Sequence, residues 1–212
     1  MHETEHIVMP ADHMEELYQA RNPLVRFAHR QRIEKITQCV AELKASRILD
    51  AGCGEGHLLA LIKKRLPGAE TFGSDIIEVA LEHARVRSPD STFVTARISE
   101  MPFADGYFDA ITCTEVLEHV YDYREALKEF RRLIRPGGYL IVTFPNEPVW
   151  TASRFLLGRR PVKVPDHVNS FTPGIMARDA GLTRINQLGL PFGLPFLFSL
   201  GYLMIFQKEI NN

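Results

Sequence analysis

The sequence predicts an α/β fold built around one doubly wound sheet. Apolar runs of strand length alternate with amphipathic stretches of helix length along most of the 212 residues. A glycine-rich turn, Asp50-Ala-Gly-Cys-Gly-Glu-Gly56, joins the first strand, Ile48 to Ala51, directly to a helical pattern. A strand, a tight turn and a helix in immediate succession are typical of a parallel sheet that carries a ligand at its strand ends.

Length and composition restrict the class of protein. A chain of 212 residues suits one domain with a full core. The formal net charge of −1 gives no global field that recruits nucleic acid, so we expect no nucleic-acid partner. Three widely spaced cysteines, Cys39, Cys53 and Cys113, predict reduced thiols and a cytoplasmic location. The polar, acidic first residues are not typical of a signal peptide.

Before the glycine turn the pattern is helical from Asp12 to about Lys44, with a break at Asn22-Pro23. Apolar residues at helical spacing form a predicted buried stripe: Leu24, Phe27, Ile33, Ile36 and Val40. Most of the basic residues between them are predicted to form a solvated face: Arg21, Arg26, Arg30, Arg32 and Lys35.

The glycine turn predicts a ligand that resembles a nucleotide. Gly52, Gly54 and Gly56 suit a turn whose backbone closely approaches a ligand, and the amides of the next helix face the same space. The dinucleotide fingerprint would need glycine where this chain has His57. Asp50 would repel a pyrophosphate but suits a cationic amino group. This register disfavours NAD.

The segment DAGCGEG resembles the first motif of the class I S-adenosylmethionine (SAM) dependent methyltransferases nearly letter for letter. The resemblance covers roughly residues 45–180. It implies a Rossmann-like, seven-stranded sheet whose last strand, Tyr202–Glu209, is antiparallel. It also implies a single domain, 1–212, with a helical lid at 11–44, a cofactor-binding core at 45–145 and an acceptor side at 146–212. Tyr18 and Arg26 are the expected lid contacts.

Asp75 ends the second strand, 19 residues after Gly56. In dinucleotide and SAM folds an acid at this place accepts hydrogen bonds from both ribose hydroxyls. Asp75 can also be the N-cap of a helix that begins at Ile77, and the two roles are compatible. That helix, 77–87, precedes a short strand, Thr92–Thr95.

The stretch 96–103 resembles the family's third cofactor segment, but Arg97 stands where an aspartate often binds the adenine amino group. Adenine recognition would then fall to the backbone at Ile98 and Ser99. Taken together, the resemblance implies these cofactor contacts: Asp50, Gly52, Cys53, Gly54, Gly56, Asp75, Ile76, Ile98, Ser99 and Thr114.

The fourth strand, Phe108–Thr114, opens onto Glu115-Val-Leu-Glu-His119, which resembles the family's small-molecule branch. The Pro-Pro-aromatic turn of base-amine methyltransferases is not present in this segment. Three interpretations of Glu115, Glu118 and His119 stay open. They form a structural helix turn, or His119 accepts the acceptor proton. In the third, they bind a divalent metal with the distant His167, as some quinone and RNA-end methyltransferases do.

A helix over 121–133 and a strand, Tyr139–Phe144, lead into the acceptor side. Residues 145–170 mix apolar and basic side chains and can cap the acceptor pocket, contact an anionic membrane surface or form an ordinary solvated helix and loop. A short helix over 172–181 and strands at 182–188 and 202–209 complete the chain. The stretch 185–207 carries no charge but contains prolines and glycines, which indicates sheet core and an apolar lip.

The predicted function is transfer of the SAM methyl group to a small, lipophilic acceptor at oxygen, nitrogen or carbon, with S-adenosylhomocysteine as product. The catalytic candidates are Glu115, His119 and His167. A divalent metal and a peripheral membrane contact stay possible partners, and the oligomeric state is not predicted. Two alternatives are a SAM-binding protein without turnover and an NAD-dependent oxidoreductase.

Overall fold

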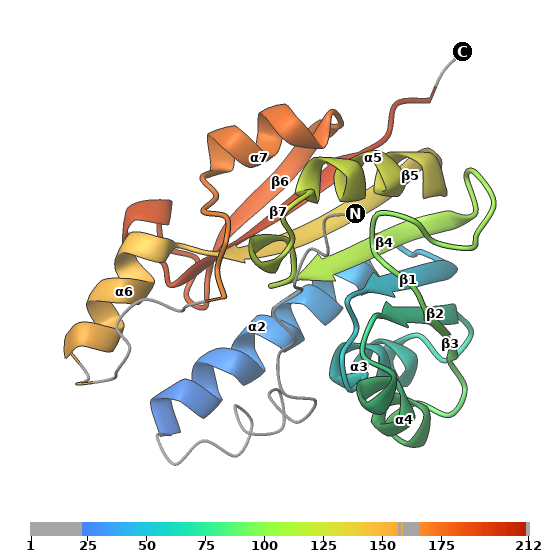
Figure 1. Ribbon diagram of the computed structural model, residues 1–212, viewed down its shortest axis with the longest axis horizontal. Helices are drawn as coiled ribbons and strands as arrows, with labels where there is room; N and C mark the ends of the chain where they lie inside the picture. The colour runs from blue at the N-terminus through green and yellow to red at the C-terminus, as the bar shows by residue number, and fades with distance from the viewer. Residues whose placement is uncertain (1–22, 157, 159–165, 211–212) are drawn as a thin grey trace, which may run out of the picture.

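The computed structural model describes residues 23–156, 158 and 166–210. Its centre is a seven-stranded sheet with the order β3-β2-β1-β4-β5-β7-β6 (Figure 1). The strands are β1 (Arg47–Ala51), β2 (Glu70–Asp75), β3 (Thr92–Thr95), β4 (Phe108–Thr114), β5 (Ile134–Pro145), β6 (Thr183–Leu190) and β7 (Gly201–Gln207). β7 runs antiparallel to both of its neighbours, and the other neighbouring strands are parallel.

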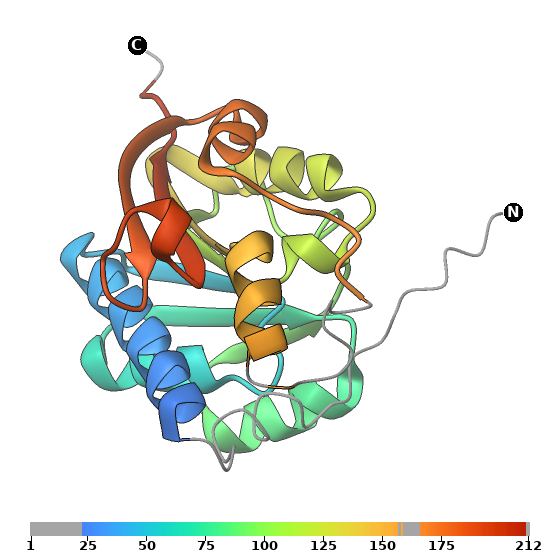
Figure 2. The same ribbon diagram turned by 90° about the vertical axis from the view of Figure 1, so that its left-hand side faces the viewer.

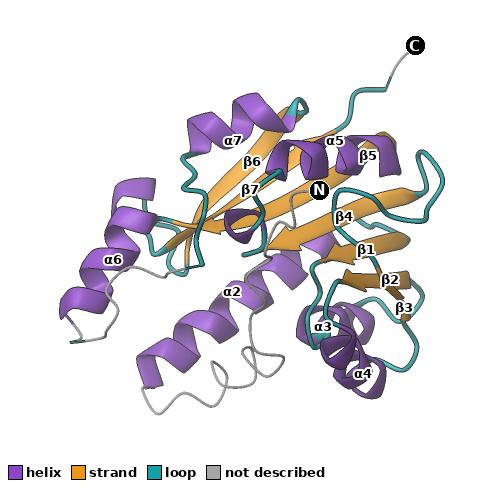
Figure 3. Cartoon of the chain, viewed as in Figure 1, coloured by secondary structure: helices purple, strands orange, loops and turns teal. Residues whose placement is uncertain are grey.

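Helices cover both faces of the sheet (Figure 3). They are α2 (Pro23–Glu42), α3 (His57–Arg65), α4 (Glu78–Arg87), α5 (Tyr123–Leu133), α6 (Glu147–Leu156) and α7 (Pro173–Ala180), with 3-10 turns η1 (Leu117–His119) and η2 (Phe196–Phe198). The helices α2, α3 and α4 lie on one face, and α5 and α7 lie on the other. The predicted doubly wound α/β fold with an antiparallel last strand is confirmed.

Each face of the sheet has its own apolar core. On the first face, Ile33 and Ile36 of α2 pack with Ile48 of β1 and Ile141 of β5. On the second face, a larger cluster joins the two covering helices to the strands: Leu127, Phe130, Phe144, Met176 and Phe206. Because successive strand residues point to opposite faces, neighbouring apolar residues such as Leu140 and Ile141 serve different cores.

The buried stripe that the sequence predicts for α2 is correct at three positions and wrong at one. Ile33, Ile36 and Val40 are buried. Phe27 is 45% exposed and stacks on Phe192, with 6.0 Å between ring centroids. Phe27 lies towards the start of the helix, beyond the part that packs on the sheet. The side chain of Leu24 and the whole of residues 11–22, including Tyr18, lie outside the described residues.

The largest difference in boundaries concerns β5, which begins at Ile134 and not at Tyr139. The Arg-Pro-Gly-Gly segment therefore runs within the strand, where the register against β4 shifts between Phe108 and Ala110. A Cβ atom at Gly138 would lie 2.8 Å from the carbonyl oxygen of Asp109, so only glycine allows this close approach. The predicted structural role of this segment agrees with this packing.

The loop that precedes α7 ends in a well-defined helix cap. Thr172 caps this helix by accepting a hydrogen bond from the amide of Ile175, Pro173 occupies the first turn, and Gly181 ends it with φ 59°. The amides of Val168 and Asn169 both donate to the carbonyl of Glu118, which attaches this loop to η1, beyond the carboxyl ends of the parallel strands. Figure 2 looks onto these ends, and α6 crosses the middle of the view.

Among the helices formed by the described residues, none has both the length and the apolar character needed to cross a membrane.

Candidate functional site

The glycine turn after β1 packs directly against the segment that follows β4. Gly52 has φ 75°, and a Cβ atom there would lie 2.5 Å from Cγ2 of Val116. The amides of Gly52 and Cys53 both donate to the carbonyl oxygen of Ser74, at 2.8 and 3.0 Å, and so tie the turn to β2. Gly54 has φ 49° and a Cβ there would meet open space. Position 52 therefore requires glycine for packing as well as for backbone conformation.

Asp50 is a buried carboxylate at the end of β1. Its Oδ1 atom accepts a 2.7 Å hydrogen bond from the Thr112 hydroxyl on β4. Burial raises the pKa of Asp50 to about 7, the Thr112 hydrogen bond opposes this rise, and the charge of Asp75 adds to it. A cationic group bound beside Asp50 would restore the ionised form, because an opposite charge favours the carboxylate.

Asp75 holds the glycine turn from β2. Its two carboxylate oxygens accept hydrogen bonds from the amides of Gly54, at 2.8 Å, and Ile77, at 3.0 Å. The helix α4 begins at Glu78 with Ile77 as its N-cap, so Asp75 is not the cap residue. Each oxygen keeps a further lone pair, so Asp75 can still accept the predicted hydrogen bonds from the ribose hydroxyls.

The remaining predicted cofactor residues lie near the ends of neighbouring strands. Ile76 is 45% exposed beside Asp75. Ile98 is buried, Ser99 is partly buried and Arg97 is exposed. Thr114 is the last residue of β4 and pairs with Thr143 of β5. The amide of Ala96 donates to the carbonyl of Asp75, so the stretch predicted to border the adenine is attached to the residue predicted to bind the ribose.

Glu115 leaves β4 in the left-handed region, with φ 55°. Its amide donates to the carbonyl of Thr143, and its carboxylate forms an ion pair with Arg32 of α2, with 3.2 Å between Oε2 and Nη1. The side chains of Arg32 and Glu115 are only 13% and 24% exposed. The prediction of a solvated face is therefore wrong for Arg32. This residue adjoins Ile33, which packs in the core under the sheet, and its guanidinium is largely buried beside Glu115.

The expected helical turn over Glu115, Glu118 and His119 is only partly formed. The 3-10 turn η1 contains Glu118 and His119, and Glu115 precedes it. Glu118 is 1% exposed, and neither carboxylate oxygen has a hydrogen-bond partner among the described residues. Burial, together with the charge of Glu115, raises the pKa of Glu118 well above its usual range.

His119 and His167 meet although 47 residues separate them, with ring centroids 4.8 Å apart. Nδ1 of His119 lies 3.1 Å from the carbonyl oxygen and 3.2 Å from Oδ2 of Asp166. Nδ1 of His167 lies 2.5 Å from Oε1 of Glu147 on α6. Acceptors at both Nδ1 atoms favour the tautomer that leaves Nε2 of each ring with a free lone pair. Burial lowers the pKa of His119, so its ring is neutral near pH 7.

Sequence reasoning did not single out Arg32, Glu147 or Asp166 as site residues. Asp166 adjoins His167, so the Asp-His pair was a usable signal. Glu147 is the first residue of α6 and resembles an ordinary first-turn acid, and Arg32 is one of several basic residues on α2. These two contacts exist only because distant segments pack together.

The cluster of Glu118, His119 and His167 has the composition of a divalent cation site. Ligand atoms of Glu118, His119 and His167 lie within 4.8 Å of one another. The two Glu118 oxygens have no partner, and both imidazoles are oriented through Nδ1 by carboxylates, as is usual for metal-binding histidines. Imidazole and carboxylate together suit several divalent metals. The residues therefore fit a metal.

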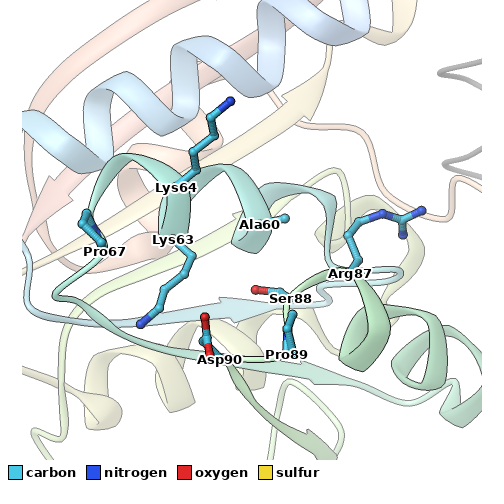
Figure 4. A pocket seen from close by; sticks show the side chains of 8 residues that line it. All are labelled: Ala60, Lys63, Lys64, Pro67, Arg87, Ser88, Pro89 and Asp90. Carbon is cyan, nitrogen blue, oxygen red and sulfur yellow. The ribbon is translucent and has the colours of Figure 1, made fainter.

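A surface hollow between α3 and the end of α4 is lined by basic residues but is not built for an anion (Figure 4). The ammonium group of Lys63 donates to the carbonyl of Ala69, and the guanidinium of Arg87 donates to the carbonyl of Glu55. Two of the three basic residues of the lining, Lys63 and Arg87, are thus engaged in holding the fold together, and Asp90 adds a carboxylate to the same lining.

Comparison with known proteins agrees with this geometry. The family model "Methyltransferase domain" matches residues 49–142. A "Demethylmenaquinone methyltransferase" of Thermus thermophilus is 36% identical over 137 residues, which cover 62% of each chain. A "Ubiquinone biosynthesis O-methyltransferase" of Alkalilimnicola ehrlichii is 38% identical over 120 residues, which cover 54% of this chain and 48% of the relative. The chain thus spans about half to three-fifths of the length of these curated relatives.

The chain is similar to the class I SAM-dependent methyltransferases, and the matches over its first strands support that family. Its fold is also that of the N-methyltransferase NodS from Bradyrhizobium japonicum, solved in complex with S-adenosylhomocysteine. The TM-score is 0.62 at 20% identity, and the match covers 89% of each chain. The family-model match and a similar probable S-adenosylmethionine-dependent methyltransferase of Mycolicibacterium smegmatis, 32% identical over 58% of this chain, support SAM as the cofactor.

Proposed function

We propose that this methyltransferase transfers the methyl group of SAM to an oxygen of a small, lipophilic, phenol-like acceptor. The observation that carries the proposal is the contact between the glycine turn and Val116, because Val116 immediately precedes the turn that bears Glu118 and His119. A cofactor held by the turn would present its methyl group to the histidine cluster. One similar protein is a ubiquinone biosynthesis O-methyltransferase, which supports a hydroxyl group as the methyl acceptor.

In this proposal residues 45–145 hold the cofactor, residues 11–44 form a lid and residues 146–212 contact the acceptor. Asp50 faces the methionyl ammonium, Asp75 accepts from the ribose, and the backbone at Ile98 and Ser99 borders the adenine. The sulfonium is already activated, so the chain contributes alignment and desolvation of the attacking oxygen. The raised pKa of Asp50 supports this arrangement, because a bound ammonium would satisfy its charge.

The acceptor side supplies the proton chemistry. His119 is neutral near pH 7 and has Nε2 free, so it can accept the hydroxyl proton as the new C–O bond forms. Glu118, His119 and His167, with Glu115 beside them, would hold a divalent cation if one binds. Such a cation supplies Lewis-acid activation by lowering the pKa of a coordinated hydroxyl group. Asp166 and Glu147 keep the imidazoles oriented in either case.

A lipophilic acceptor agrees with the apolar surface around the carboxyl ends of the strands. Large apolar side chains are exposed on the loop between β6 and β7 and at the end of α6: Leu156, Phe192, Leu197 and Phe198. Figure 2 places this loop and α6 on the same face of the molecule. We propose that this face contacts a membrane peripherally while the protein resides in the cytoplasm. Co-sedimentation with anionic vesicles, lost in Leu197→Gln/Phe198→Gln, tests that contact.

The decisive experiment is calorimetric titration with SAM, S-adenosylhomocysteine and NAD, followed by methyl-transfer assays with lipophilic phenols in the presence of Mg²⁺ or EDTA. Saturable binding of the first two ligands and a methylated phenol are expected. Binding of NAD alone would overturn the assignment. SAM binding without turnover on any phenol, amine or carbon acid would instead favour a non-catalytic SAM-binding protein.

Methylation at carbon is a second candidate, because a demethylmenaquinone methyltransferase is among the similar proteins. Mass spectrometry of the product separates the two. An O-methyl ether loses its methyl group to hydroiodic acid, whereas a C-methyl product retains it.

A further inference from the structure

Arg32 places a largely buried positive charge beside the acidic cluster. Its guanidinium pairs with Glu115, and its charge lowers the pKa of Glu118, opposing the effects of burial and of Glu115 and Glu147. Nε of Arg32 is buried and has no hydrogen-bond partner among the described residues. A guanidinium has five N–H donors, and the described residues leave the donor on Nε of Arg32 unused. The side chain is therefore held by fewer hydrogen bonds than it could form.

The helix backbone that carries Arg32 is fixed. Ile33 and Ile36 pack into the core against β1 and β5. Arg32 therefore can leave Glu115 by a rotation of its own flexible side chain, without movement of α2. The ion pair is an exchangeable contact on a rigid support.

Glu115 is the residue that two cations can share. Its Oε2 atom pairs with Arg32, while its Oε1 atom is buried and has no hydrogen-bond partner in the described part of the chain. Glu115 stands between the end of β4 and the 3-10 turn that carries Glu118 and His119. A divalent cation bound by Glu118, His119 and His167 would attract the same carboxylate.

We propose that Arg32 is a positioning residue that acts as an exchangeable counter-charge: it holds Glu115 until a divalent cation takes over that carboxylate. This inference rests on the metal site of the proposed function. Because guanidinium and metal compete for one carboxylate and repel each other, Arg32 lowers the affinity of the site for the metal. Metal binding and the Arg32–Glu115 ion pair are thereby coupled: metal binding weakens the ion pair, and the ion pair weakens metal binding by the same factor.

The test is direct binding of Mn²⁺ to the full chain, measured by the loss of its free electron paramagnetic resonance signal without SAM or acceptor. Arg32→Gln should tighten Mn²⁺ binding by about 5- to 150-fold, the usual range for coupling between two ligands. Arg32→Lys, which keeps the positive charge, should stay much closer to the wild type. Arg30→Gln removes the same charge from an exposed position on the same helix and should change affinity little, because solvent and salt screen it.

Thermal unfolding of each variant shows whether it is folded. Folded Arg32→Gln that binds Mn²⁺ no more tightly than the wild type would overturn the exchange. An equal gain in Arg30→Gln would also overturn it, since the effect would then follow net charge alone. If no variant binds Mn²⁺, the metal site and the exchange both fall, whereas SAM binding and methyl transfer would still decide the proposed reaction independently.

Discussion

The two halves of the candidate site are built in different ways. The cofactor half, at the ends of β1 and β2, consists of neighbouring residues in one turn, and its main contacts are backbone amides bound to Asp75 and Ser74. The acceptor half combines side chains from α2, η1, α6 and the chain at 166–167. A site made by local backbone geometry leaves a continuous motif in the sequence. A site made by packed side chains leaves scattered single residues.

The two halves also differ in how their buried acids are satisfied. Asp50 has the Thr112 hydroxyl as a partner, whereas Glu118 has none among the described residues. A buried polar group without a partner costs about 1–3 kcal/mol, and a charged one costs more. We therefore expect variants in the acceptor half to act mainly on rate and metal binding, and variants in the cofactor half to act on stability and SAM affinity.

The largest effect is expected for His119→Ala. Loss of the proton acceptor should slow methyl transfer by about 10²–10⁴-fold and leave SAM affinity unchanged. Single-turnover rates and calorimetry measure the two quantities. The matched control is His83→Ala, an exposed histidine on α4, which should behave as the wild type. Full activity of His119→Ala would assign this residue a structural role.

A pair of glycine substitutions tests how tightly the cofactor half is packed. Gly52→Ala places a methyl group 2.5 Å from Cγ2 of Val116 at φ 75°, so we expect a loss of about 2–4 kcal/mol in the free energy of unfolding. Gly54→Ala meets open space and should cost only about 1–2 kcal/mol for its left-handed backbone. Urea unfolding of both variants measures the difference. Equal losses would contradict the packing explanation.

Asp75→Ala should weaken SAM binding by about 1–3 kcal/mol, because it removes the proposed charge-assisted hydrogen bonds to the ribose and the acceptor for the Gly54 amide. Asp75→Asn keeps one carbonyl oxygen and should lose less binding free energy than Asp75→Ala. Calorimetric titration with S-adenosylhomocysteine gives both values. An affinity that does not change in the alanine variant would remove the ribose role.

The smallest effect is a pH dependence due to Asp50. Its pKa is about 7 in the folded protein and near 3.8 in a model peptide, so the folded state binds this proton more tightly. The contribution of Asp50 therefore destabilises the fold as pH rises from about 4 to about 7. Asp50→Asn removes the charge. Without SAM, its free energy of unfolding at pH 8 should therefore be about 1–2 kcal/mol higher than that of the wild type.

That advantage should be smaller at pH 5, because between the two pKa values the penalty on folding grows with each pH unit and is complete only above about pH 7. Urea unfolding at the two pH values checks the sign. With SAM bound the order at pH 8 should reverse, because only the ionised Asp50 attracts the ammonium. A wild type that is more stable than Asp50→Asn at pH 8 without ligand would contradict the raised pKa of Asp50.

Sequence alone determined the features that depend on local pattern. The alternation of strand and helix predicted the doubly wound sheet, since side-chain periodicity follows directly from backbone geometry. The glycine spacing around Asp50 predicted the family, because a tight turn against a ligand tolerates few other residues. His119 and His167 were also visible, since they stand in recognisable segments.

Tertiary structure alone decided how the acceptor half is assembled. Arg32 was assigned to a solvated face, yet it pairs with Glu115. Nothing in the sequence singled out Glu147, which contacts His167 because α6 packs beside that residue. Phe27 was assigned to the core, yet it lies exposed against Phe192. The physical reason is that ion pairs and ring contacts between distant segments depend on how helices dock on the sheet, and helical periodicity does not specify which side-chain ends then meet.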